Sequence, residues 1–262
     1  MPPARIVFWA ATLGGIAFTV YAVLTRPPSL AVAVACTLAY GALITTGVLV
    51  LRLRMFADAI VEAPEGARGV ALTFDDGPDP ETTKEVLDIL DRRGVKATFF
   101  VIGRKVEEHP DVVKEIIERG HEVGVHGYAH DRLFSLRGAK RVRADLERAI
   151  RTLEGITDKR PVLFRPPIGH TNPTIARVAD ELDLIVVGWT VAARDGIART
   201  KVDDVVARVS RGVRDGAIVV MHDAAERGGR KPAGVAALGA VLDAIEDKNL
   251  SVVPLATFVV DD

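Results

Sequence analysis

The sequence of 262 residues contains a single cysteine, Cys36. One thiol excludes an internal disulfide framework and any zinc site that is built from several cysteines. Neither charge sign is in excess, because 34 Lys and Arg residues stand against 35 Asp and Glu residues. Without a strong positive field, we predict no nucleic-acid partner. No Gly-rich phosphate loop follows the first predicted strand, and this absence disfavours a nucleotide-binding function.

Charge is missing altogether from two long stretches near the N-terminus. Residues 6–25 and 30–51 carry no charged side chain, and Arg26-Pro-Pro-Ser29 separates them. As a helix, each run of about 20 residues would span roughly 30 Å, the hydrocarbon thickness of a bilayer. A signal peptide is the alternative for the first run, and a buried core helix for either run alone. Two runs in tandem favour a transmembrane hairpin in residues 1–53, with the lipid bilayer as its partner.

Arginines at the ends of this hairpin suggest its orientation. Arg5, Arg52 and Arg54 flank its outer ends, whereas only Arg26 lies in its turn. The positive-inside rule therefore predicts a two-pass membrane protein with both termini and the rest of the chain in the cytoplasm. The polar residues 54–68 follow. We interpret them as a linker or a short amphipathic helix that keeps the next domain near the bilayer.

From residue 69 to residue 262, short β-rich runs alternate with helical patterns. The predicted strands cover residues 70–74, 97–102, 122–125, 162–164, 184–189, 217–221 and 251–253. The helical patterns cover residues 82–93, 110–119, 136–153, 173–182, 202–213 and 234–248. Several of them have the expected start and stop signals, Pro, Asp or Thr before the helix and Gly after it. The alternation predicts an α/β domain with a parallel sheet, either doubly wound or closed as a barrel.

Unusual polar residues gather where these predicted strands end. They are Asp75 and Asp76 after the first strand, His126 and His130 after the third, Arg165 after the fourth, Asp195 after the fifth, and His222 at the end of the sixth. In a β/α barrel the carboxyl ends of the strands share one face, and active sites are built on that face. We therefore predict that these side chains form one site.

The two histidines His126 and His130 are four positions apart, so both can reach one ion from a helical turn or a tight loop. Two histidines and a carboxylate are a common ligand set for a divalent metal. Unrelated surface histidines are the alternative. A cation would also relieve the repulsion between the adjacent carboxylates of Asp75 and Asp76. One carboxylate could bind the metal while the other takes a proton from metal-bound water, whose pKa the metal lowers.

The remaining polar residues fit this chemistry in more than one way. His222 could protonate a leaving group or act as a third imidazole ligand. Arg165 could hold a carboxylate through two parallel hydrogen bonds, with Pro166 and Pro167 stiffening its loop, or form a structural ion pair. Asp195 could equally be a turn residue. No nucleophile elbow for seryl or cysteinyl catalysis is present, so the reaction class that fits is metal-assisted hydrolysis of an amide or ester.

Six segments carry a resemblance to a known family. They are Thr73-Phe-Asp-Asp-Gly-Pro78, Ala97-Thr-Phe-Phe-Val-Ile-Gly103, His126-Gly-Tyr-Ala-His130, Arg165-Pro-Pro-Ile-Gly169, Asp195 and Val220-Met-His222. Through them, residues 69–262 resemble the NodB-homology polysaccharide deacetylases, carbohydrate esterase family 4. The resemblance implies a distorted (β/α)7 barrel that removes N- or O-acetyl groups from chitin, peptidoglycan, xylan and related sugars. It also implies one divalent metal ion, usually zinc and sometimes cobalt or nickel.

The resemblance further implies a role for each residue of the site. The matching motif positions are the metal ligands Asp76, His126 and His130, the base Asp75, the arginine Arg165 that orients the base, the acid His222, and Asp195, which tunes the acid. In the loop that contains Pro167, the backbone N–H of Ile168 would help to bind the oxyanion.

The sequence departs from the family pattern at Gly127, Ile168, Gly196 and Val220. The last two positions usually carry a Trp and a Leu that wall the acetate pocket, so we expect this pocket to be reshaped or roomier. Three hypotheses follow: a membrane-anchored carbohydrate deacetylase, a deacetylase or deformylase of a lipid-linked amino sugar, and an inactive glycan-binding membrane protein. The wall glycans on which the family acts favour the outer side of the membrane, against the charge rule.

Overall fold

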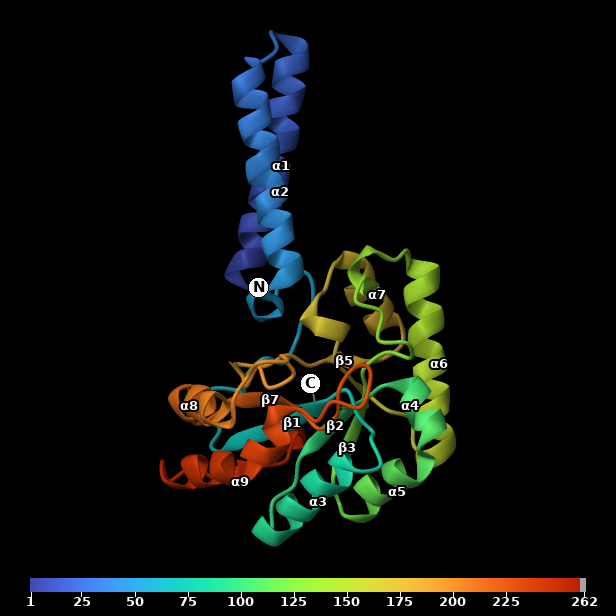
Figure 1. Cartoon of the computed structure of the whole chain (residues 1–262). Helices are drawn as coiled ribbons and strands as arrows, with labels where there is room; N and C mark the ends of the chain where they lie inside the picture. The colour runs from blue at the N-terminus through green and yellow to red at the C-terminus, as the bar shows by residue number, and fades with distance from the viewer. Residues whose placement is uncertain (260–262) are drawn as a thin grey trace.

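The computed structural model describes residues 1–259, so the last three residues of the predicted domain, 260–262, lie outside the described part. Two antiparallel helices, α1 (Pro3–Leu24) and α2 (Leu30–Leu49), stand out from the rest of the chain as a column (Figure 1). Both are long and apolar enough to cross a membrane. Within them only Gly47 is buried. They are therefore not core helices of the domain, because a core helix buries its apolar side chains.

Residues 50–69 connect this hairpin to the domain without an α-helix. A single 3-10 turn, η1 (Leu51–Leu53), comes first. The chain then runs extended, and Ile60 pairs with Val187 and Glu62 with Ala217 as isolated bridges. The predicted alternative of an amphipathic helix is wrong here, because alternate residues are buried, as in a half-buried strand. The buried residues of this segment, which we call the strap (55–62), are Met55, Ala57, Ala59 and Val61.

The domain is built on a parallel sheet that curls into a half-barrel. Its strands are β1 (Val70–Asp75), β2 (Thr98–Val101), β3 (Glu122–Val125), β4 (Leu163–Phe164), β5 (Ile185–Val186), β6 (Val191–Ala192), β7 (Ile218–His222) and β8 (Val252–Val253). They lie in the order β5-β4-β3-β2-β1-β7-β6, and β8 pairs with the start of β1. This curled α/β sheet with helices outside it confirms the predicted distorted barrel.

The predicted strand 184–189 contains only the short β5, and β6, which was not predicted, begins just after it at Val191 on the opposite edge of the sheet. The amide of Gly188 donates to the carbonyl of Ile60 in the strap, and the amide of Thr190 donates to Ile218 of β7. Between β5 and β6 the chain therefore crosses from one edge strand to the other. The strap bridges the same gap, because it pairs on one side with Val187 and on the other with Ala217. Sheet curvature, which periodicity does not report, causes this break.

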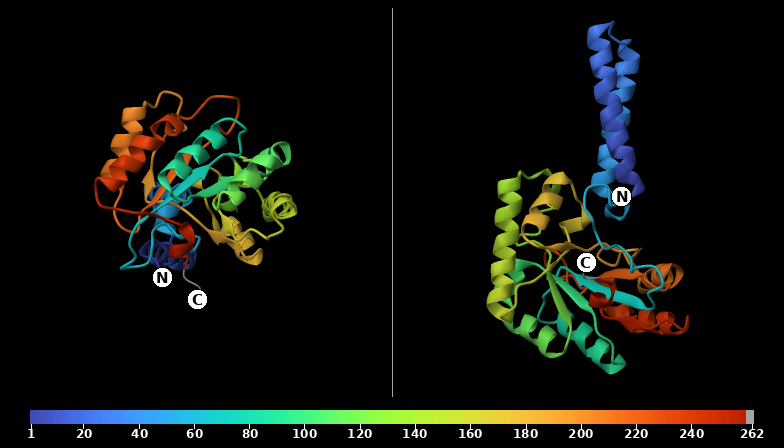
Figure 2. Two further views of the ribbon diagram at one scale, coloured as in Figure 1. Left: turned by 90° about the horizontal axis from the view of Figure 1, so that it is seen from below. Right: turned by 180° about the vertical axis from the view of Figure 1, so that it is seen from behind.

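Helices cover the outer side of the sheet (Figure 2). They are α3 (Thr82–Arg93), α4 (Gly103–Glu108), α5 (Pro110–Glu118), α6 (Ala139–Thr157), α7 (Pro173–Glu181), α8 (Val202–Gly212) and α9 (Ala233–Glu246), with 3-10 turns η2 (Phe134–Leu136), η3 (Pro167–Gly169) and η4 (Leu255–Phe258). The six predicted helices are all present. The short α4 was not predicted, and α6 begins later than expected because η2 occupies residues 134–136.

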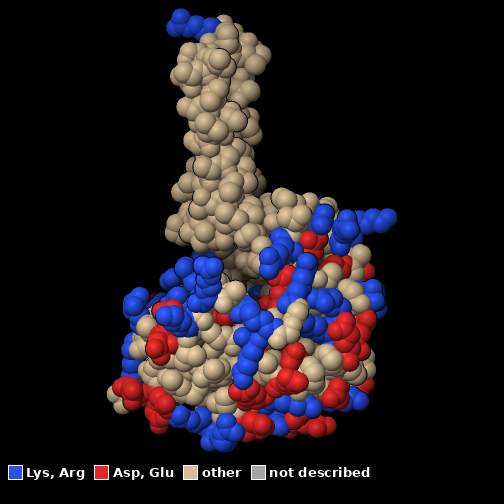
Figure 3. Space-filling view, in the orientation of Figure 1, with Lys and Arg blue, Asp and Glu red and all other residues tan. Residues whose placement is uncertain are grey.

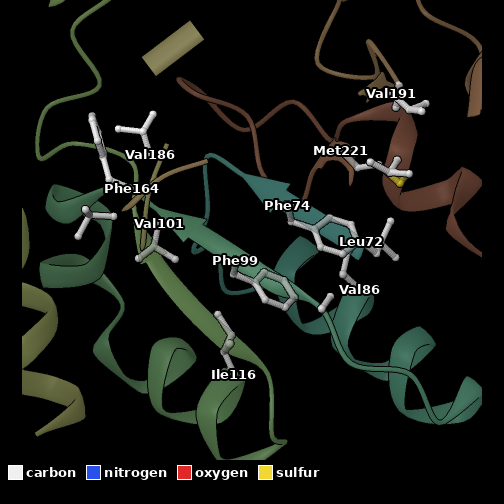
Figure 4. Packing of buried hydrophobic residues seen from close by; sticks show 14 of the residues in the cluster. Leu72, Phe74, Val86, Phe99, Val101, Ile116, Phe164, Val186, Val191 and Met221 are labelled. Carbon is white, nitrogen blue, oxygen red and sulfur yellow. The ribbon is translucent and has the colours of Figure 1, made fainter. Parts of the chain in front are cut away.

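The central strand β1 is buried along its whole length. Helices cover one side of the parallel sheet, η4 packs on the other, and the strap contributes side chains to both hydrophobic clusters, so apolar residues point both ways. Figure 4 shows the packing, in which Phe74 of β1 stacks on Phe99 of β2 with ring centroids 5.1 Å apart. This rigid centre places the last residue of β1, Asp75, at the carboxyl edge of the sheet.

Candidate active site

The structure brings the predicted polar residues together at the carboxyl edge of the sheet. Strand register sets the first contact, because Asp75 ends β1 directly beside His222 at the end of β7. The loop after β3 carries His126 and His130, and Arg165 follows β4. Asp195 follows β6 rather than β5. The sequence pattern did not predict the short β6, but Asp195 still reaches the site.

Asp76, His126 and His130 form a buried cluster whose nitrogen and oxygen ligand atoms all lie within 4.8 Å of one another. Nε2 of His130 is 3.2 Å from Oδ1 of Asp76, and Nε2 of His126 is 3.6 Å from the same oxygen. The Nδ1–H of His126 donates to the carbonyl of Arg165 at 2.7 Å, which leaves Nε2 with its lone pair facing Asp76. Oriented imidazole nitrogens of this kind are typical of metal ligands.

The protonation states of this cluster fit a divalent cation. Burial lowers the pKa of His126 and of His130, so both imidazoles are neutral at pH 7, the form that binds a metal. Burial raises the pKa of Asp76, and His222 and His130 oppose this rise only in part. Oδ1 of Asp76 is buried without a hydrogen-bond partner among the described residues. A set of two imidazoles and one carboxylate, with a carboxylate oxygen that lacks a hydrogen-bond partner, suits zinc or a similar cation.

His126 and His130 come close to each other in a loop, not on a helical turn. His130 has a φ of 49° and Asp76 a φ of 76°, both in the left-handed region. The carboxylate of Asp145 on α6 accepts hydrogen bonds from the amides of Tyr128 and Ala129 and so supports the loop. Gly127 has a φ of 74°, which favours glycine over the Ser or Thr of the family pattern.

Asp75 is held by a fully buried arginine. Nη1 of Arg165 donates to Oδ1 of Asp75 at 2.7 Å and to Oγ1 of Thr73 at 2.8 Å. Its other nitrogens donate to the carbonyls of Val187 and Gly188, so the contact is not the predicted pair of parallel hydrogen bonds. Burial alone would raise the pKa of Asp75, but Arg165 and the neighbouring histidines outweigh it and hold that pKa below its usual range. Asp75 is therefore ionised at neutral pH.

His222 is positioned by Asp195 and does not belong to the cluster of Asp76, His126 and His130. Nδ1 of His222 is 2.8 Å from Oδ1 of Asp195, and the backbone amide of His222 donates to Oδ2. Burial alone would lower the pKa of His222, but Asp195, Asp76 and Asp75 raise it to about 9. Asp195 is fully buried, so it is not merely a turn residue. Gly234 of α9 packs against the carboxylate of Asp195. A larger residue would not fit there, because a Cβ at position 234 would lie 1.9 Å from Oδ2 of Asp195.

The loop after Arg165 is strained where a backbone donor was predicted. Ile168 has a φ of 52°, an outlier for a β-branched residue, and its side chain is exposed. Pro167 is buried beside it, and Trp189 lies against Gly169 so closely that a Cβ at Gly169 would meet its ring at 2.3 Å. A Cβ at Gly196 would be 3.4 Å from the ring of His222. Because glycine has no side chain, no side chain from this position covers that side of the His222 ring.

Sequence reasoning missed several polar residues behind the cluster. Oε1 of Glu226 lies 3.3 Å from Nδ1 of His130. Nζ of Lys105 donates to the backbone carbonyl of Asp76 at 2.6 Å. Asp223 is fully buried, and burial raises its pKa to about 7. Asp223 directly follows His222, and that adjacency is the only signal that could have drawn attention to it.

The site lies directly below the hairpin. The amide of Thr171, which follows the Arg165 loop, donates to the carbonyl of Val48 near the end of α2 at 3.1 Å. Leu51 of η1 packs near Gly188, next to the carbonyl that receives Arg165. The end of the apolar helix and the loop of the candidate site are therefore one continuous packing unit.

Comparisons with known proteins agree with this geometry. A family model described as Polysaccharide deacetylase matches residues 62–187. The peptidoglycan-N-acetylglucosamine deacetylase PgdA of Listeria monocytogenes is 40% identical over 154 residues, 59% of this chain and 32% of that protein. This chain thus matches about a third of the length of that relative. A peptidoglycan-N-acetylglucosamine deacetylase of Bacillus cereus is 34% identical over 191 residues, 72% of this chain and 86% of that protein. Among solved structures, a CE4 family pseudoenzyme from Bacillus anthracis has a TM-score of 0.70 at 28% identity, covering 79% of this chain and 70% of that one.

Proposed function

Because this chain belongs to the polysaccharide deacetylase family, we propose that it is a metal-dependent hydrolase that removes N-acetyl or O-acetyl groups from a carbohydrate. The observation that carries the proposal is the complete set of groups at one sheet edge. An ionised Asp75 on Arg165 and a protonated His222 on Asp195 flank the cluster of Asp76, His126 and His130. The peptidoglycan deacetylases among the relatives support an acetylated glycan as substrate.

The residues divide the work of hydrolysis between them. Asp76, His126 and His130 would hold a divalent cation, most simply Zn²⁺, which when bound lowers the pKa of water and polarises a carbonyl. Asp75 would accept the proton of the attacking water on Oδ2, since Arg165 occupies its Oδ1. His222 would deliver its Nε2 proton to the departing nitrogen or oxygen, while Nδ1 keeps its hydrogen bond to Asp195. The backbone N–H of Ile168, in the strained loop beside Pro167, would stabilise the oxyanion.

A lipid-linked amino sugar is a second candidate substrate, favoured by one contact. The hydrogen bond from Thr171 to Val48 holds the site at the base of the hairpin. A sugar on a membrane lipid would arrive at the level of the site, whereas a distant polymer would need to reach the bilayer. The acyl group could be acetyl or formyl, because no side chain at Gly196 walls that side of His222.

The test uses the full chain in lipid nanodiscs with one acetylated oligosaccharide presented in two forms, free and attached to a polyprenyl carrier. We expect release of acetate, its loss with a chelator and its recovery when Zn²⁺ is returned. Faster turnover of the carrier-linked form supports the second candidate, and faster turnover of the free form counts against it. Bound metal without hydrolysis of either form would instead support the glycan-binding alternative. Turnover that persists without metal would refute the proposal.

The side of the membrane on which the site lies can be decided separately. The arginine distribution supports the cytoplasmic side for the domain, and the relatives that act on peptidoglycan support the outer side. A reporter that is active on only one side of the membrane, fused after Asp262, distinguishes the two placements. Its companion fusion between Arg26 and Ser29, in the hairpin turn, must give the opposite result in a two-pass protein. Equal signals at both positions would contradict the hairpin.

A further inference from the structure

A cavity of about 530 Å³ lies between the base of the hairpin and the domain, beside the segment where the two are in contact. Its roof is the end of the hairpin, Leu49 to Arg52, and its inner wall is Gly169 and Trp189 of the site loops. The remaining wall carries three arginines from β6 to α8, Arg194, Arg208 and Arg211. Figure 3 shows Lys and Arg side chains gathered directly below the hairpin, over this part of the domain.

The charge of this cavity is one-sided. Four arginines line it, and no Asp or Glu does so among residues 1–259. None of the four forms an ion pair with a described residue, whereas most other surface arginines of the domain do. Only Arg208 has a described side-chain hydrogen bond, from Nη1 to the carbonyl of Ala193. Like charges that share a cavity without a counter-ion repel one another, and a bound anion would relieve that repulsion.

A purely structural role accounts for only part of the cluster. Arg211 lies in the last turn of α8, and Arg208 one turn earlier, where cations interact favourably with the helix dipole. Arg52 and Arg194 lie on other elements and gain nothing from that helix. Arg194 has a φ of 56°, so it takes its place in the wall from a left-handed backbone conformation.

The position of the cavity points to the chemistry of the anion. Helix α2 ends at Leu49, so the cavity opens where an apolar span meets water. Its wall combines guanidinium groups with the apolar side chains of Leu49, Val50 and Trp189. Guanidinium groups match phosphate oxygens in geometry and charge. A ligand with a phosphate head and a hydrocarbon tail satisfies both parts of this wall.

We propose that this arginine cavity, lined by Arg52, Arg194, Arg208 and Arg211, binds the phosphate or diphosphate ester of a lipid at the membrane surface. The wall at Gly169 is part of the same loop as Ile168, so a sugar linked to that ester would extend from the cavity toward the loop of the candidate site. The assignment of this ester to a lipid-linked saccharide substrate rests on the proposed function. Binding of the ester itself does not, and it is measured without hydrolysis.

The experiment compares binding of three lipids to the detergent-solubilised full chain by native mass spectrometry: a polyprenyl diphosphate, phosphatidylglycerol and the uncharged polyprenol. The variant is Arg208→Gln/Arg211→Gln. A second variant, Arg52→Gln/Arg211→Gln, avoids the hydrogen bond of Arg208 to Ala193. The matched control is Arg92→Gln/Arg160→Gln, which removes one arginine from the end of α3 and one that donates to Leu182, both beside strand starts at the opposite edge of the sheet.

We expect the polyprenyl diphosphate to bind wild-type and control protein, and each cavity variant to lose on the order of tenfold or more in affinity, since each removes two charge-assisted contacts. The uncharged polyprenol should bind wild-type, control and variant proteins with the same affinity. Equal losses for phosphatidylglycerol would identify the bulk lipid headgroup as the source of the phosphate. Retention of both charged lipids at wild-type level by both cavity variants would overturn the proposal.

Hydrolysis separates this inference from the proposed function. The cavity variants should deacetylate the free oligosaccharide at the wild-type rate and lose activity only toward the carrier-linked form. Loss of activity toward both forms, with normal metal content, would show that the arginines shape the catalytic centre, and it would overturn the cavity's role as a separate subsite. An inactive wild-type protein that still binds the diphosphate through these arginines would leave the subsite standing and refute the deacetylase.

Discussion

The hairpin and the domain place apolar and charged groups in opposite ways. Along α1 and α2 the large apolar side chains point outward, and Leu38 is 68% exposed. In the domain the largest fully buried side chain is charged, that of Arg165. The exposed apolar surface of the helices is the kind of surface that a membrane-spanning hairpin would present to lipid. The domain instead buries an arginine, because Asp75 and backbone carbonyls accept its hydrogen bonds.

Where the two regions meet, both patterns are present at once. Arg5 at the start of α1 pairs with Asp58 and donates to the carbonyl of Met55, which fastens the hairpin to the strap. Thr171 of the site loop donates to Val48 of α2.

The strongest disturbance of the domain removes the base. Asp75→Asn should lower the rate of deacetylation on the order of 10²–10⁴-fold, because the amide cannot accept a proton. His126→Ala should abolish activity together with bound metal, measured by elemental analysis beside acetate release. Asp88→Asn, on the outer surface of α3, is the control and should keep full activity. An active Asp75→Asn protein would contradict the role of this residue.

Breaking the buried ion pair should cost stability as well as activity. Arg165→Met leaves the buried Asp75 unpaired, and we expect a loss of about 3–5 kcal/mol in the free energy of unfolding. The surface pair of Arg214 and Glu62 is the matched comparison. Arg214→Gln should cost at most about 1 kcal/mol. Urea denaturation in detergent measures both, and equal losses would show that burial does not distinguish the two pairs.

A charge in the hairpin should affect membrane insertion and leave the domain fold unchanged. Leu38→Arg places a guanidinium near the middle of α2, where the insertion cost is about 2.5–3.5 kcal/mol. We expect part of the protein to become extractable from membranes by alkaline carbonate. Leu136→Arg, at an equally exposed apolar position of the domain, should remain in the membrane fraction. Equal extraction of both variants would refute the transmembrane hairpin.

The smallest expected change concerns pH. His222 must be protonated to act as an acid, so kcat/KM should fall as the pH rises through its pKa of about 9. Asp195→Asn removes the main group that raises this pKa, so the alkaline limb should move to lower pH by about one to two units. Asp203→Asn, an exposed acid on α8, should leave the limb in place. An unchanged limb in Asp195→Asn would contradict the coupling of these residues.

The local sequence pattern predicted helices and strands well where each segment had its own hydrophobic periodicity and its own start and stop residues. The helices at 82–93 and 173–182 and the strand at 122–125 lie within a residue of their predicted bounds. The predicted strand at 184–189 contains only β5, and β6 at 191–192 was not predicted. In residues 54–68 the alternative of a short helix is wrong, because Met55, Ala57 and Ala59 are buried at every second position, as in a strand. Sequence period reports which side chains are buried, not which partner covers them.

Sequence pattern alone was enough to single out the candidate site residues, because all of them follow or end predicted strands: Asp75, Asp76, His126, His130, Arg165, Asp195 and His222. A choice between their alternative contacts required the folded structure. It gave Arg165 a single-nitrogen contact to Asp75, set Asp195 behind His222, and brought Glu226 near His130. It also placed four arginines from separate segments around one cavity below the hairpin. Contacts between residues distant in the chain depend on sheet curvature and loop course, which no local pattern encodes.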